Sequence, residues 1–257
     1  MPRTKTANLP DDAALLVPPS PLLLAVEQVM LRSTDGSRAS ASIGERIAVR
    51  LAGAITLDRV RAGQRLLESD ISALMQVSRA PVREAFRQLV VEGLLESVPQ
   101  RGTFVARLSR ARIADAVFVR EVIECEAAAL AAAAPLAQRK SLSAILRRQA
   151  SASARADYGT HLSTDEEFHH QILVLAGHPH AWAPLRLART GMNRIRHLAI
   201  PELGSHRIAI DHHKAIVEAI LAGDAQGAAA AMRVHIRSPL TFLEAIQQRL
   251  PQYFDPD

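Results

Sequence analysis

Residues 43–105 constrain the fold most strongly, because apolar side chains there change from helical spacing to strand alternation. Spacings of three and four residues predict helices over 43–55, 68–75 and 79–93. Two short alternating segments follow, around a turn at 99–102, and they predict a β-hairpin. Three helices followed by a hairpin make a winged helix-turn-helix. The side chains expected to face its core include Ile71, Leu74, Val82, Phe86, Leu89 and Val90.

The helix expected at 79–93 has clear start and stop signals. Ser78 is a good N-cap residue, and Pro81 falls in the first turn, where its missing N–H removes no helical hydrogen bond. Gly93 can adopt the left-handed conformation that ends many helices. We expect the winged helix-turn-helix to extend over residues 37–107.

Arginines on this helix have the spacing of a DNA-reading surface. Arg79 and Arg83 are four residues apart, so they share one helix face, opposite the apolar face. Near the N-terminus of such a helix, an arginine can donate two hydrogen bonds to guanine in the major groove. Ser78 can contact a phosphate, and Arg101 at the hairpin turn can reach the minor groove or the backbone. The alternative for each arginine alone is a solvated surface charge.

The overall charge is compatible with DNA binding. The formal net charge is +5 at pH 7, and lysine occurs only at Lys5, Lys140 and Lys214. Arginine suits phosphates and guanine edges because its planar guanidinium donates parallel hydrogen bonds. A GC-rich genome would produce the same preference for arginine, so both explanations stay open.

The region from about 43 to 106 resembles the GntR family of regulators through the runs VSRAPVREA (77–85), EGL (92–94) and RG (101–102). It departs from the family at Ala62-Gly63, where many members have Pro-Gly, a small loss of turn rigidity. The resemblance implies a DNA-binding protein. The residues that it assigns to DNA are Ser78, Arg79, Pro81, Arg83, Arg101 and Gly102.

Histidines are confined to the second half of the chain, where only helical periodicities occur. All ten lie at or after His161. Asp165 and His169 are spaced i and i+4 on one helix face, while His213 and His235 each lie on the apolar stripe of a later helix. One carboxylate and three imidazoles directed into a helical bundle predict a divalent metal site. The alternative is that each histidine is a satisfied polar group.

This half also resembles the FCD ligand-binding domain of FadR-type GntR regulators. The likeness spans about 112–245, through the runs REVIE (120–124), DEEFH (165–169), HKAI (213–216), GD (223–224) and MRVH (232–235). It implies an all-helical bundle over 112–250 that holds a divalent ion, Zn, Ni or Mn. The implied ligands are Asp165, His169, His213 and His235. His170 and His212 adjoin two of these positions, so an assignment shifted by one residue stays open.

Four protein ligands would leave one or two positions of a six-coordinate ion for an effector. A carboxylate effector suits such positions, and Arg120 would supply its counter-charge. Arg194 is a second candidate for the same cavity. The alternative for Arg120 is an ion pair with Glu124, four residues along the helix.

The remaining features concern the N-terminus and the cellular location. Residues 1–36 are expected to form a partly disordered extension, with a short amphipathic helix over 21–33. No run of about 18 apolar residues lacks charge, so no membrane span is expected. The lone Cys125 favours a reducing cytoplasm and is expected to be a small buried side chain rather than a reactive thiol.

Taken together, these patterns predict a cytoplasmic DNA-binding transcription regulator, a repressor, that is not an enzyme. Its expected partners are a second copy of the chain, a short inverted-repeat DNA operator and a small organic acid. The alternatives are a metal-dependent enzyme fused to a DNA-binding module and an architectural DNA-binding protein. The sequence has no G-x-S-x-G elbow and no general base at a motif spacing beside the metal ligands, which argues against an enzyme.

Overall fold

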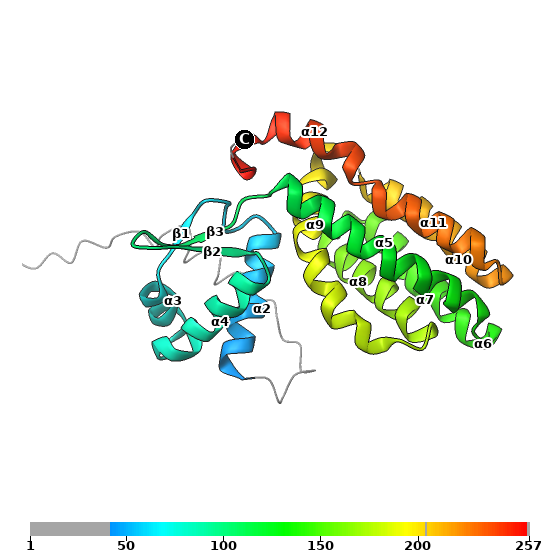
Figure 1. Ribbon diagram of the computed structural model, residues 1–257, viewed down its shortest axis with the longest axis horizontal. Coiled ribbons are helices and arrows are strands. Elements are labelled where there is room, and N and C mark those ends of the chain that lie inside the picture. The colour runs from blue at the N-terminus through cyan, green and yellow to red at the C-terminus, as the bar shows by residue number, and fades with distance from the viewer. Residues whose placement is uncertain (1–41, 204, 256–257) are drawn as a thin grey trace, which may run out of the picture.

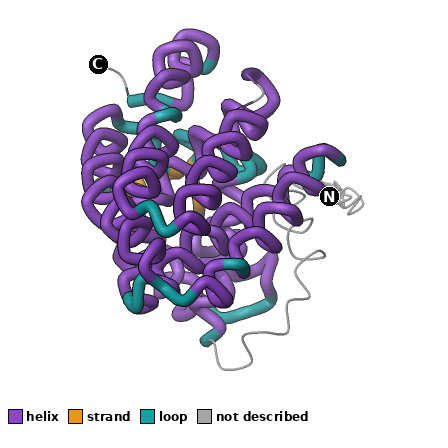
Figure 2. Tube along the Cα trace, turned by 90° about the vertical axis from the view of Figure 1, so that its right-hand side faces the viewer, coloured by secondary structure: helices purple, strands orange, loops and turns teal. Residues whose placement is uncertain are grey.

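The computed structural model describes residues 42–203 and 205–255, which form two adjacent units (Figure 1). The first unit contains a small sheet and three helices, and the second contains only helices. Helices make up most of the described chain (Figure 2). This arrangement confirms the expected fold class, mainly α, with a winged helix-turn-helix followed by an all-helical bundle. The extension predicted over 1–36, including its helix over 21–33, lies outside the described residues.

The first unit follows the predicted order of elements. Its helices are α2 (Ile43–Thr56), α3 (Glu68–Met75) and α4 (Arg79–Val91). Its strands are β1 (Arg65–Leu66), β2 (Leu95–Val98) and β3 (Gly102–Val105), in the antiparallel sheet order β1-β3-β2. The sequence did not predict β1, because two residues are too short to show an alternating pattern.

The two ends of α4 form as the sequence predicted. Ser78 occupies the N-cap position with extended backbone angles, although its side chain makes no capping hydrogen bond. Gly93 follows the C-cap with φ +71°, the left-handed conformation that closes the helix. Val82 and Leu89 are fully buried, as expected, but Val90 is 38% exposed, so its prediction as a core residue is wrong. Its Cβ lies about 100° around the helix from that of Leu89, which turns it out of the packed face.

The second unit is built around one long helix. That helix, α5, packs against α8, α9, α10 and α11, as facing helices do in a bundle whose apolar stripes meet in one core. The bounds are α5 (Arg110–Ala133), α6 (Leu136–Arg139), α7 (Ser141–Ala154), α8 (Tyr158–Leu175), α9 (Trp182–Leu203), α10 (Ser205–Ala222), α11 (Ala225–Arg237) and α12 (Leu240–Arg249). Among the helices that the structure describes, none has the length and apolar character needed to cross a membrane.

The chain's last described segment and α9 both connect the two units. After α12, the 3₁₀ turn η3 (Pro251–Tyr253) returns to the linker between the units, residues 106–109. There the Leu108 amide donates to the Tyr253 carbonyl at 2.8 Å. The Tyr253 hydroxyl donates to the Asp58 carboxylate in the first unit. From α9, Arg194 donates to the Ala106 carbonyl at 2.7 Å. In Figure 1 the C-terminal segment lies at the junction of the two units.

A substitution pair on α4 tests the packing of the first unit. Leu89→Ala removes a fully buried side chain, so we expect the free energy of unfolding to fall by about 2–5 kcal/mol. Val91→Ala, two residues further on at a position 77% exposed, should change it by less than about 0.5 kcal/mol. Urea denaturation followed by circular dichroism measures both. Equal losses in the two variants would contradict the assignment of the buried face.

Candidate nucleic-acid interface and metal centre

The exposed face of α4 carries a row of arginines. Ser78, Arg79 and Arg83 are exposed, and Pro81 is half-buried beside them in the first turn. Arg87 extends the row by one helical turn and pairs with Glu84. Arg87 was not among the residues predicted to contact DNA, although its spacing from Arg83 equals the spacing between Arg79 and Arg83.

Arg83 is held in place by α3. Its guanidinium donates to the Glu68 carboxylate at 3.2–3.4 Å, and the Arg83 side chain stays 62% exposed. Both groups face solvent, so the pair stabilises the fold weakly. It does limit the directions in which the guanidinium points, which favours a bidentate contact with a guanine edge.

The hairpin turn presents Arg101 and Gly102 at the other end of the unit. Arg101 is exposed and lies 6.0 Å from the Phe104 ring centre. Gly102 opens β3 with φ +109°, and a Cβ there would lie 3.0 Å from the Arg65 side chain. Glycine at this position therefore lets β3 pass close to Arg65.

The structure brings the four predicted metal-ligating residues together in the bundle. Asp165 and His169 come from α8, His213 from α10 and His235 from α11, and all four are buried. One ligand atom from each lies within 4.8 Å of the other three. Atoms that share an ion with bonds of about 2.1 Å are at most about 4.2 Å apart, so the group is within about 1 Å of coordinating geometry. His170 instead packs near Trp182, with ring centres 5.3 Å apart, and His212 is not part of the group.

Neighbouring side chains orient two of the imidazoles. His213 Nδ1 lies 2.7 Å from Gln149 Oε1, an oxygen that can only accept, so Nδ1 carries the proton. His169 Nδ1 lies within ion-pair distance of the Glu124 carboxylate, although without hydrogen-bond geometry. The opposite nitrogen of each ring, Nε2, is buried and has no hydrogen-bond partner among the described residues. These Nε2 atoms lie 3.5 Å (His213) and 3.9 Å (His169) from the Asp165 oxygens, which leaves their lone pairs for a ligand.

Burial sets the charge state of the group. It lowers the pKa of His169 to about 4, with a further contribution from Arg189, and it also lowers the pKa values of His213 and His235 well below the ordinary value. Neutral imidazoles are the form that binds metal. Burial alone would raise the pKa of Asp165, but the adjacent Arg196 holds it well below its usual range. The group therefore contains an ionised carboxylate and three neutral rings.

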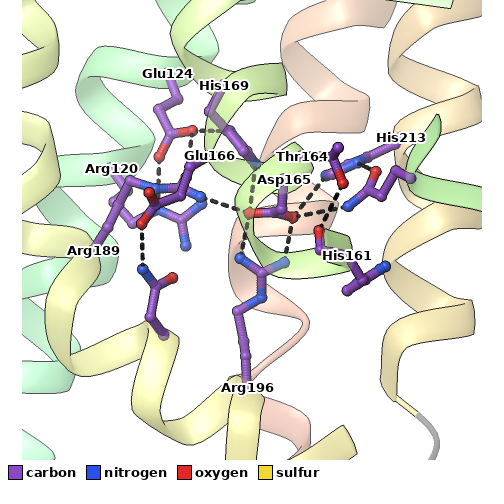
Figure 3. Close-up of polar contacts among 12 residues, drawn as sticks. Arg120, Glu124, His161, Thr164, Asp165, Glu166, His169, Arg189, Arg196 and His213 are labelled. Atoms are coloured by element: carbon purple, nitrogen blue, oxygen red, sulfur yellow. Dashed lines mark hydrogen bonds and ion pairs between the residues drawn. The ribbon is translucent and has the colours of Figure 1, made fainter. Parts of the chain in front are cut away.

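Two arginines of α9, absent from the sequence predictions, hold the Asp165 carboxylate (Figure 3). Arg196 donates to both of its oxygens, and Arg189 donates to Oδ2 at 2.7 Å. These arginines are seven residues apart, two helical turns, so they share a face of α9. A carboxylate offers about four lone pairs, and Gln149 Nε2 takes the fourth with a long hydrogen bond to Oδ1 at 3.4 Å. A metal ion on Asp165 would therefore replace this weak donor. In the sequence, the spacing of seven residues indicates that Arg189 and Arg196 share a helix face, but it does not show that this face contacts Asp165.

The structure separates the two predicted effector residues. Arg120 is buried beside the metal-ligating group and pairs with Glu124 at 2.6 Å, while its Nη2 has no hydrogen-bond partner. The ion pair that was the alternative for Arg120 is thus present, but inside the bundle rather than on its surface. Arg194 bonds the Ala106 carbonyl between the two units instead of a member of the group. Its assignment to the same cavity as Arg120 is therefore corrected, because it lies five residues from Arg189, on another face of α9.

The buried charges around the metal-ligating group do not cancel. Arg120, Arg189 and Arg196 carry three positive charges against two negative charges on Glu124 and Asp165. Uncompensated buried charge costs several kcal/mol. A divalent ion would raise this excess of positive charge further.

A winged helix with an exposed arginine row, joined to a helical bundle, defines the class of DNA-binding transcription regulators. Residues 43–105 match the family described as bacterial regulatory proteins, gntR family, and residues 115–238 match the FCD domain. The chain belongs to the GntR family, in its FadR-type subfamily. Members are transcription factors rather than enzymes, which decides against the metalloenzyme alternative.

Known proteins similar to this chain are regulators of the same kind. An HTH-type transcriptional regulator of an unstable DNA locus in Streptomyces ambofaciens is 35% identical, over 76% of this chain and 82% of the relative. The transcriptional repressor RspR of Escherichia coli K12 is 28% identical, over 77% of this chain and 87% of the relative. The solved structure of E. coli McbR/YncC superposes with a TM-score of 0.69 at 19% identity, over 81% of this chain and 99% of that chain, which supports the fold.

Glu124 tests how far the buried ion pairs stabilise the bundle. Glu124→Gln removes the negative charge opposite Arg120 and Arg189, and we expect the free energy of unfolding to fall by about 3–5 kcal/mol, as when one partner of a buried pair is lost. Glu167→Gln breaks only an exposed pair with Arg148 and should cost at most about 1 kcal/mol. Chemical denaturation compares the two variants. A similarly small loss of stability in both variants would show that the ion pairs of Glu124 contribute little to the stability of the bundle.

Proposed function

We propose that this regulator is a homodimeric repressor whose binding to an inverted-repeat operator depends on a divalent metal ion and a small carboxylate effector in its helical bundle. The observation that carries the proposal is the meeting of Asp165, His169, His213 and His235, drawn from three helices, with imidazole nitrogens that lack any partner in the described chain. Buried polar atoms without partners are costly. A bound ion would accept their lone pairs.

The chain's own residues would prepare this site before an ion arrives. Gln149 fixes the imidazole proton of His213 on the outer nitrogen, the Glu124 carboxylate lies beside the outer nitrogen of His169, and Arg196 keeps Asp165 ionised. A divalent ion, when bound, would offer open coordination positions to an anionic oxygen. Zn, Ni and Mn all accept imidazole and carboxylate ligands.

The effector would be an acid because two buried guanidinium nitrogens need an acceptor. Arg120 Nη2 and Arg189 Nε are both buried without a hydrogen-bond partner. A carboxylate between these nitrogens and the metal-ligating residues would form charge-assisted hydrogen bonds, which are among the strongest in proteins. It would also offset the excess positive charge of the site.

Effector binding would act through α9. The cavity beside His235 and Arg196 has a volume of only about 20 Å³, room for about one water molecule. Arg120 and Arg189 do not line this cavity, so an effector that reached them from it would displace part of its wall, which includes Ile195 and Arg196 of α9. Because α9 also contacts α2 and bonds the linker through Arg194, its displacement would change the orientation of the winged helix. An effector with different affinities for the two orientations would shift their populations.

DNA binding would place α4 in the major groove and Arg101 beside it. One winged helix reads few base pairs, and a twofold-symmetric dimer doubles the length of DNA read. We therefore expect two copies of the chain to bind one short inverted repeat. Sedimentation of the operator complex should therefore give two chains per site.

Substitutions on α4 test the DNA interface. Arg79→Ala and Arg83→Ala should each weaken binding to the operator by about 1–3 kcal/mol, as expected when a base contact is lost, and Arg101→Ala should cost less. Arg147→Ala, at an exposed position of α7, is the control for loss of one surface charge. Fluorescence anisotropy with DNA fragments enriched by the purified protein measures the affinity. Equal weakening on random DNA would mean that these arginines contact phosphates only.

Metal content tests the central part of the proposal. We expect about one divalent ion per chain in protein purified without chelator or nickel affinity resin, and EDTA should lower the melting temperature because the ion stabilises only the folded chain. His213→Ala should lose the ion and become insensitive to EDTA. His180→Ala, an exposed histidine outside the group, should behave as wild type. A wild-type protein without metal, with a melting temperature unaffected by EDTA or added Zn, would refute the metal site.

Carboxylate binding is tested separately on the metal-loaded protein. Within a panel of two- to six-carbon mono-, di- and tricarboxylic acids, at least one should raise the melting temperature, by an amount that grows with its concentration. Arg120→Gln should abolish that rise while keeping the response to metal. Arg147→Gln is the matched control. A carboxylate response that survives in Arg120→Gln would remove Arg120 from the effector site.

A further inference from the structure

A second cavity, of about 280 Å³, lies between the two units. Its wall combines Gly93 at the end of α4, Leu108 in the linker, Ile113 of α5 and Gly191 of α9. None of the four metal-ligating residues lines it. Its volume is just below the range of about 300–1,000 Å³ typical of small-molecule sites.

The charged side chains that line this cavity are mostly basic. Arg107, Arg112 and Arg194 line it together with Glu92 and Asp115. Glu92 already pairs with Arg186 of α9 at 3.2 Å, which reduces its effect on the cavity. The three guanidiniums therefore outweigh the remaining Asp115 carboxylate.

Arg194 is the unusual member of this set. It is only 5% exposed, and its hydrogen bond to the Ala106 carbonyl leaves its charge unpaired. Among the described residues, Arg194 forms no ion pair with a carboxylate, although Asp58 and Tyr253 act on it from further away. A buried guanidinium is usually paired with an acid. Its position on the cavity wall points to an anion as the missing partner.

Gly191 gives an independent reason to regard the cavity as a binding site. It lies inside α9, where glycine destabilises a helix relative to alanine. A Cβ added at Gly191 would meet no atom of the described residues within 4 Å, so no packing contact among them requires glycine there. The missing side chain leaves open the part of the cavity that Leu187 and Met192 border with apolar surface.

We propose that this cavity binds one amphipathic organic anion, with its acidic group at Arg107, Arg112 and Arg194 and its apolar part against Gly191 and the neighbouring side chains of α5 and α9. The site does not depend on the metal centre. Because its wall includes residues of both units, a bound anion would favour the relative orientation in which that wall is closed around it.

The test uses 8-anilinonaphthalene-1-sulfonate, a fluorescent dye with aromatic rings and one sulfonate, titrated into the full-length protein. We expect saturable binding of one dye per chain. Gly191→Leu should abolish it by filling the cavity. Gly159→Leu is the matched control, at another helical glycine, where an added Cβ would lie 3.8 Å from its nearest neighbour. This control should bind the dye as wild type does.

A second variant examines the charge requirement. Arg112→Ala should weaken dye binding about tenfold, as for loss of a hydrogen bond to a charged group, whereas Arg147→Ala should not. N-phenyl-1-naphthylamine, a related aromatic amine without the sulfonate, should bind wild type and Arg112→Ala equally. If circular dichroism shows that Gly191→Leu is misfolded, the binding of the two dyes to wild type and Arg112→Ala tests the proposal instead.

Three results would overturn the proposal. Wild-type dye binding in folded Gly191→Leu would place the dye elsewhere. Equal weakening of both dyes by Arg112→Ala would remove the charge selectivity. Loss of the dimer in Gly191→Leu, seen by sedimentation velocity, would assign the cavity to a contact between two copies of the chain. None of these results bears on the metal-dependent function, which has its own variants.

Discussion

The ionised carboxylate of Asp165, buried completely in the bundle, is the interaction on which the second unit depends. Removing a carboxylate from water costs several kcal/mol even after relaxation, and only close partners compensate for it. Arg189 and Arg196 provide that compensation from one face of α9, while His169 and His213 approach from α8 and α10. The positions of these three helices are therefore set by one charge as well as by apolar packing.

This dependence makes α9 a helix that contacts both the buried charge and the first unit. One of its faces holds Asp165, and another holds the linker through Arg194 and the end of α4 through the Arg186–Glu92 pair. Protein interiors are close-packed and transmit displacements instead of absorbing them. A change in the partners of Asp165 would therefore reach the winged helix by movement of one rigid element, without a chain of separate contacts.

The sequence predicted what depends on local spacing or on a shared family pattern. The helices of the winged unit, the stop at Gly93 and the meeting of His213 and His235 with the α8 ligands all belong to this group. It did not predict the partners of Asp165, because Arg189 and Arg196 lie 24 and 31 residues away and only the tertiary packing brings them close. Arg194 was misplaced for the same reason: spacing along α9 gives its face but not the neighbour of that face.

Arginines of this protein lie in two different surroundings. On α9, Arg189 and Arg196 are buried and paired with Asp165, so their guanidiniums are fixed before any ligand arrives, and breaking a pair is costly. On α4 the arginines are exposed, and the Arg83–Glu68 pair is worth at most about 1 kcal/mol. A base contact worth about 1–3 kcal/mol would be enough to replace that pair. Burial thus makes Arg189 and Arg196 part of the framework, whereas exposure would leave the arginines of α4 free to exchange partners on DNA.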